Sequence, residues 1–116
     1  MVRTFLIKNA PIERINFWLN RNAVKLKYGE NYRDFNFKQC LAISTEEING
    51  QLVGVSSIMN RDIWPQHFYR ILNRHFILPE HRTGYKRDGV ADRTLNIIKQ
   101  QAQLAVKNKA ECIFVS

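Results

Sequence analysis

An Asn-Gly dipeptide near the middle of the chain constrains the fold more than any other feature. Asn49-Gly50 separates two apolar runs of strand character. Both residues adopt positive φ angles readily, and the resulting two-residue turn suits the twist of two antiparallel strands. We therefore expect strands over residues 35–44 and 51–59, joined as a hairpin by this dipeptide.

The rest of the sequence predicts a mixed α/β fold. Apolar and β-branched runs predict further strands over residues 4–8, 67–78 and 111–115. Helices are expected after Pro11, over residues 23–28, and from an N-cap at Asp88 to Asn108. The last helix carries a stripe of apolar residues: Ala91, Leu95, Ile98, Ala102 and Ala105. The predicted order is β-α-α-β-β-β-α-β, with a crossover helix before the last strand.

Length and composition indicate a single domain over residues 1–116. The start of the chain is too short and too interrupted for a signal peptide, and no apolar run approaches the roughly 20 residues of a membrane span. We therefore expect a cytoplasmic protein with no membrane association. Cys40 and Cys112 lie in apolar runs and are expected to be buried free thiols. The sequence contains no cluster of Cys and His residues that would predict a metal site.

The chain is strongly basic, with a net charge of +8 and a pI near 9.9. A partner of negative charge is therefore expected. Nucleic acid, an anionic cofactor and an acidic surface all fit, and charge does not choose among them.

One segment gathers the features of a phosphate site. A basic, glycine-containing loop runs from Pro79 to Ala91, between a predicted strand and a predicted helix. Free N–H groups and the positive end of the helix dipole favour an anion at such a place. The alternative is a solvated basic turn with an ordinary helix cap at Asp88.

Three motifs in this order resemble the GNAT superfamily of acyl-CoA-dependent N-acyltransferases. The hairpin Glu47–Gly54 is similar to the family's acid-x-Asn-Gly turn, and Ile77–Arg82 is similar to its strand end V-x-P-E-x-R. Lys86–Ala91 is the nearest match to its pyrophosphate loop, Arg/Gln-x-x-Gly-x-Gly/Ala. The resemblance covers most of the chain and is best from Leu41 onward.

The resemblance implies a GNAT-like, mostly antiparallel sheet that is incomplete at the C-terminus. The family continues past the last strand with a helix and two more strands, whereas this chain ends at Ser116. A truncated reading frame or a partner copy that completes the sheet would explain the difference. We therefore expect a homodimer.

The resemblance also implies acetyl-CoA as acyl donor and an unidentified primary amine as acceptor. The backbone of Phe76, Ile77 and Leu78 would pair with the pantetheine arm. The pyrophosphate would lie on the N–H groups of Arg87, Asp88, Gly89, Val90 and Ala91. An apparent insertion before Gly89 leaves either Arg82 or Lys86 at the start of the phosphate loop.

No catalytic base or acid can be assigned from the sequence. His75 is a candidate on the strand, with a hydrogen-bonded structural histidine as the alternative. Two other functions stay open. One is a basic nucleic-acid-binding module, and the other is a degenerate relative that binds CoA or only takes part in an assembly.

Overall fold

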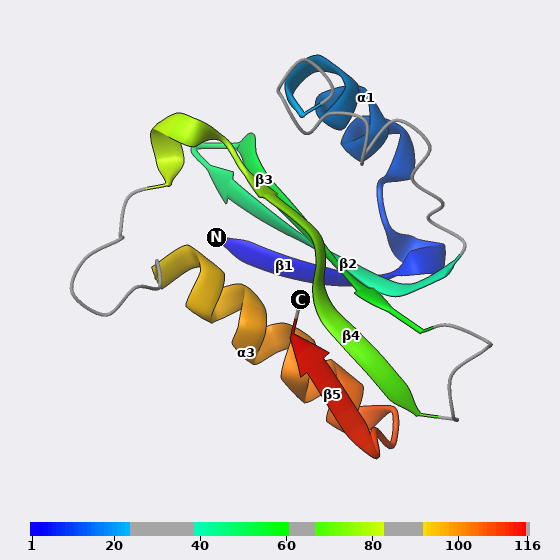
Figure 1. Cartoon of the computed structure of the whole chain (residues 1–116). Coiled ribbons are helices and arrows are strands. Elements are labelled where there is room, and N and C mark those ends of the chain that lie inside the picture. The colour runs from blue at the N-terminus through cyan, green and yellow to red at the C-terminus, as the bar shows by residue number, and fades with distance from the viewer. Residues whose placement is uncertain (24–38, 61–66, 83–91, 116) are drawn as a thin grey trace.

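The structure is a computed structural model that describes residues 1–23, 39–60, 67–82 and 92–115. These residues form a five-stranded sheet with one helix on each face (Figure 1). The strands are β1 (Val2–Leu6), β2 (Cys40–Ile48), β3 (Gln51–Met59), β4 (Phe68–Ile77) and β5 (Cys112–Val115). The helices are α1 (Ile12–Asn22) and α3 (Asp92–Lys107), with short 3-10 turns η1 (Ile7–Asn9) and η3 (Pro79–His81).

The strand order is β1-β2-β3-β4-β5, so each strand lies beside its neighbour in sequence. The first three pairs are antiparallel, and only β4 and β5 are parallel. Parallel neighbours need a crossover connection, which α3 supplies. The expected mixed α/β class, with a crossover helix before the last strand, is confirmed.

The core has two sides because side chains alternate along each strand. On β2, Ile43 faces α1 and Ala42 faces α3. The α1 side buries Ile15, Leu19, Ala23, Ile43, Val55 and Phe76. The α3 side buries Ala42, Ile58, Tyr69, Ile71 and Ala105. At roughly 25 cal/mol per Å² of apolar surface, this two-sided burial supplies the main stabilising term of the fold.

The predicted hairpin is confirmed at the predicted residues. Asn49 and Gly50 have φ values of 51° and 79°, and Ile48 pairs with Gln51 directly across the turn. Gly54, which ends the same motif, has a separate packing role. A Cβ there would collide with Cδ1 of Ile77 on β4. The second glycine therefore leaves room for the Ile77 side chain to lie over β3.

Two predicted strands have wrong boundaries, and the first begins at Val2 instead of residue 4. The first strand ends at Leu6, and Ile7–Asn9 form η1. The second strand continues past Ser44 to Ile48 because Glu46 is paired on both sides, with Val2 on β1 and with Gly54 on β3. Pairing on two edges outweighs the weak strand preference of the polar residues here. Residues 24–28 of a predicted helix and 35–38 of this strand lie outside the described residues.

The predicted apolar stripe of α3 is confirmed at Ala105 and wrong at Leu95. Leu95 is 41 % exposed, and the fully buried residues are Ile97, Gln101 and Ala105. Ile98 and Ala102 are only partly buried, and Ala91 lies outside the described residues. The helix thus directs a glutamine into the core in place of a leucine.

β5 lies at the edge of the sheet, and part of its apolar surface is exposed to solvent. Phe114 and Val115 are both exposed, and the Phe114 ring lies 5.8 Å from that of Phe68 on β4. Within the described segments, no helix combines the length and apolar character needed to cross a membrane.

Of the two free cysteines expected to be buried, Cys40 is buried and Cys112 is only half-buried, so their reactivity should differ. Cys40 is 5 % exposed, and burial raises the pKa of its thiol to about 11, against a smaller lowering by a hydrogen bond with Ser57. At pH 8 about 0.1 % of such a thiol is ionised. Mass-spectrometric mapping with iodoacetamide should therefore find Cys112 modified in the folded protein and Cys40 modified only after unfolding. Equal rates at both sites would contradict this packing.

Candidate functional site at the second half of strand β4

β4 carries two more residues than its neighbour β3 over their shared length. Val55 pairs with Phe76, Ser57 with Asn73, and Met59 with Arg70. At each step β3 advances by two residues and β4 by three. Each extra residue makes a β-bulge, which bends the strand and redirects its edge groups.

The bulges coincide with unusual backbone angles. Leu72 and Arg74 have φ values of 53° and 51°, in the left-handed region that non-glycine residues rarely adopt. Such a conformation costs on the order of 1 kcal/mol or more per residue and persists where surrounding contacts impose it. The middle of β4 is therefore a strained bend held by its neighbours.

The pairing with β5 covers only the first half of β4. It runs from Phe68 with Cys112 to Ile71 with Val115, the last described residue of β5. We call residues 72–77 the open half of β4. Among the described residues, no strand pairs with its outer edge. An extended ligand can add to such an edge through main-chain hydrogen bonds.

Of the three residues predicted to pair with the pantetheine arm, Phe76 and Ile77 lie in the open half and Leu78 follows it directly. Phe76 is 2 % exposed and packs edge-on against Trp18 of α1, with 5.7 Å between ring centroids. Ile77 is 6 % exposed and packs on the α3 side with Ile97. Leu78 is half-buried, and its N–H donates to the carbonyl of Val53 at 2.8 Å. Their side chains are core, so any ligand contact of Phe76 and Ile77 would come through the backbone.

Arg82 folds back onto the end of β4. Its Nε donates to the carbonyl of Ile77 at 2.7 Å, and its guanidinium lies 5.4 Å above the centre of the Phe76 ring. A cation over an aromatic face contributes about 0.5–1 kcal/mol at exposed sites. Arg82 thus places positive charge next to the open half.

His75 joins the open half to the first turns of α3. Its Nε2 lies 3.2 Å from Oγ1 of Thr94. Burial, and secondarily the charge of Arg82, lowers the pKa of His75 below its usual 6.5. The imidazole is therefore neutral at pH 7 and can accept a proton only against both effects.

The same contact places the N-terminal part of α3 beside the open half of β4 (Figure 1). A helix N-terminus carries unpaired N–H groups and partial positive charge, so this arrangement favours an anion. Of the predicted phosphate-loop residues, Lys86, Arg87, Asp88, Gly89, Val90 and Ala91 lie outside the described residues. The structure brings together His75, Phe76, Ile77, Leu78 and Arg82.

The carboxylates near the hairpin are engaged elsewhere. Glu47 accepts from Nη1 of Arg14 at 2.6 Å, and the terminal ammonium of Met1 lies 3.5 Å from Oε1 of the buried Glu46. Among the described residues, no group of three or more His, Cys, Asp or Glu side chains could hold a metal ion.

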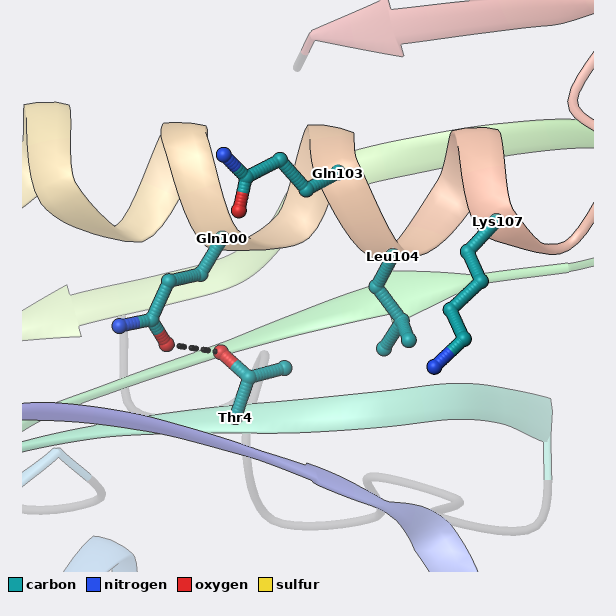
Figure 2. Close-up of a pocket in the computed structure, with 5 residues that line it drawn as sticks. All are labelled: Thr4, Gln100, Gln103, Leu104 and Lys107. Carbon is teal, nitrogen blue, oxygen red and sulfur yellow. Dashed lines mark hydrogen bonds between the residues drawn. The ribbon is translucent and has the colours of Figure 1, made fainter.

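A small hollow lies elsewhere, between β1 and the C-terminal half of α3 (Figure 2). It has a volume of about 220 Å³ and is lined by Thr4, Gln100, Gln103, Leu104 and Lys107. It contains none of the predicted site residues.

Two polar residues next to the open half were missed by the sequence reasoning. Thr94 contacts His75, and Gln101 contacts the backbone of Leu72. The signal for Gln101 was present, since a polar residue four positions from Ile97 and from Ala105 interrupts an apolar face. Thr94 had no comparable signal.

Several solved structures that share this fold are acetyltransferases. An aminoglycoside acetyltransferase from an uncultured soil metagenomic sample superposes with a TM-score of 0.66 at 14 % identity, covering all of this chain and 78 % of that one. The aminoglycoside N-acetyltransferase AAC(6')-Iy, solved with CoA, gives 0.59 at 11 % identity over 78 % of its chain. A predicted acetyltransferase from Clostridium acetobutylicum, solved with acetyl-CoA, gives 0.52 at 19 % identity over 79 % of its chain.

These neighbours are structures of the GNAT class, so the fold expected from the motifs is the fold observed. No protein-family model matches the chain, and no curated protein matches it by sequence. At such identities the likeness concerns the fold.

The environment of His75 makes a prediction about pH. An NMR titration of its imidazole should give a midpoint below 6.5, and Arg82→Gln should raise that midpoint only in part because burial remains. The folded pKa is lowered, so the unfolded chain binds more protons as the pH falls below 6.5, and folding loses stability there.

Urea unfolding at pH 7.5 and pH 5 measures this loss. The unfolding free energy should fall more in the wild type than in His75→Gln. A titration midpoint above 6.5, or an equal fall in both proteins, would contradict the described burial.

Proposed function

We propose that this protein is an acyl-CoA-dependent N-acyltransferase of the GNAT class, with acetyl-CoA as donor and a primary amine as acceptor. The observation that carries the proposal is the open half of β4, which lies beside the N-terminal part of α3 in a GNAT fold. CoA and acetyl-CoA are present in two of the structural neighbours, which supports the same donor class here.

The residues at the open half fit an elongated, anionic ligand. The side chains of Phe76 and Ile77 are buried in an extended strand, so a ligand at this edge would meet the main chain. The N-terminal end of α3 and the guanidinium of Arg82 supply positive potential for phosphates. The predicted loop around Gly89 lies between these elements in sequence, where backbone N–H groups could approach a pyrophosphate closely.

The donor would present its activated thioester to an amine bound next to β4. In this proposal a backbone N–H of the open half polarises the acyl carbonyl, since a fixed donor stabilises developing negative charge. The amine attacks that carbonyl, the C–S bond breaks as the C–N bond forms, and CoA leaves as a thiolate that takes up the equivalent of the proton that the amine loses. His75 is neutral and could accept that proton directly or through water, although its lowered pKa makes it a weak base.

Isothermal titration calorimetry separates this proposal from nucleic-acid binding. The wild type should bind acetyl-CoA at micromolar concentration, and Gly89→Asp should weaken that binding at least about tenfold, because a carboxylate repels the pyrophosphate. Gln103→Glu is the matched control. It makes the same change in net charge on the exposed surface of α3 and should leave the affinity within about twofold.

A short single-stranded oligonucleotide, titrated at two salt concentrations, completes the experiment. Salt-sensitive oligonucleotide binding without heat from acetyl-CoA would refute the acyltransferase proposal and favour the nucleic-acid module. Equal weakening of acetyl-CoA binding by both variants would show that net charge, and not the predicted loop, drives the interaction.

A further inference from the structure

Gln101 is a buried amide at the centre of α3. It is 0 % exposed and lies between the equally buried Ile97 and Ala105 on the helix surface that faces the sheet. Burying an amide without hydrogen-bond partners is costly, so its position needs compensation. Gln101 has that compensation on both ends of its side chain.

The two ends of the amide contact different strands. Oε1 accepts from the backbone N–H of Leu72 on β4 at 2.8 Å, and Nε2 donates to Oγ of Ser44 on β2 at 3.1 Å. The peptide N–H can only donate, so the amide has one possible orientation. Gln101 therefore bridges β2 and β4 across the intervening β3.

The same hydrogen-bond chain continues to the edge of the sheet. Thr4 Oγ1 donates to Oε1 of Gln100 at 2.7 Å (Figure 2), which uses its only proton. The 2.8 Å contact between Thr4 and Ser44 must then have Ser44 as donor. Gln100 closes the chain by donating to the carbonyl of Val2 at 3.1 Å.

All these bonds run in one direction, from Leu72 to Val2. Each hydroxyl accepts one bond and donates the next, and each of the two amides uses one acceptor and one donor. Such chains are cooperative, and a missing link leaves a buried polar group without a partner. The chain ties the strained residue of β4 to β1 through α3.

We propose that Gln101 is a positioning residue that holds Leu72 in its left-handed conformation and thereby sets the course of β4 through residues 73–77. Leu72 has φ 53° within the bulge between the pairs Met59–Arg70 and Ser57–Asn73. The hydrogen bond from the Leu72 N–H to Gln101 fixes this bend to α3. The consequence for acyl-CoA binding rests on the function proposed above.

The first measurement uses the wild-type protein and needs no ligand. A scalar coupling across the hydrogen bond should connect the Leu72 amide nitrogen with the side-chain carbonyl carbon of Gln101 in NMR spectra. Backbone carbon shifts of Leu72 should also indicate the left-handed region. Absence of the coupling, or extended-strand shifts at Leu72, would overturn the proposal whatever the protein binds.

The second measurement compares three variants by NMR and by calorimetry with acetyl-CoA. Gln101→Met keeps the side-chain size but removes both hydrogen bonds. Ser44→Ala breaks the next link and leaves the acceptor for Leu72 in place. Gln103→Met is the surface control on the same helix, since Gln103 is exposed.

Only Gln101→Met should move the Leu72 shifts toward extended values and speed exchange of its amide by about tenfold beyond the change in global stability. It should also weaken acetyl-CoA binding by about tenfold, while Ser44→Ala and Gln103→Met remain within about threefold. Equal effects of Gln101→Met and Ser44→Ala on Leu72 and on binding would reduce Gln101 to a general packing role and overturn the proposal.

The two proposals can fail separately. If the wild type does not bind acetyl-CoA, the proposed function fails while the coupling and exchange data still test the role of Gln101. If acetyl-CoA binds equally well to Gln101→Met, and Leu72 keeps its shifts and protection, the positioning role fails while the proposed function stands.

Discussion

The mismatch between β3 and β4 is the constraint on which the site depends. Two extra residues in β4 must be accommodated against β3, and they produce bulges with left-handed angles at Leu72 and Arg74. The first half of β4 lies in register with β5, and the bend separates it from the half where we propose the ligand lies. The mismatch therefore sets the direction in which the edge groups of that half point.

The contacts around β4 compensate for its strain. Gly54 allows Ile77 to lie closely over β3, Arg82 donates to the carbonyl of Ile77, and Gln101 accepts from Leu72. These contacts come from a strand, a loop and a helix far apart in the sequence. A strained bend held from several directions is a pre-organised site, because less conformational freedom remains to be lost on binding.

The sequence was sufficient for the features that local chemistry decides. The Asn49-Gly50 turn, the crossover helix and the order of the described elements follow from turn residues and hydrophobic period. The bulges could not be foreseen, because Leu72 and Arg74 carry no local preference for left-handed angles. Long-range pairing with β3 imposes those angles.

The prediction of which face of α3 points inward was wrong in part for a related reason. An apolar stripe through Leu95 assumes that the inward face avoids polar residues, whereas Gln101 is drawn inward by the N–H of Leu72 and the hydroxyl of Ser44. The candidate site was predictable in part. The position of residues 76–78 followed from the resemblance, while the contacts of His75 and Arg82 depend on how the strand end and the helix meet.

The most direct test of the account is to locate acetyl-CoA on β4 by NMR. Titration of the labelled protein should shift the amides of residues 73–77 most strongly and slow their exchange with solvent. The amides of residues 68–71, already paired with β5, should change little. Saturable binding with its largest shifts elsewhere, for example around the hollow beside Lys107, and none in the open half would contradict the account.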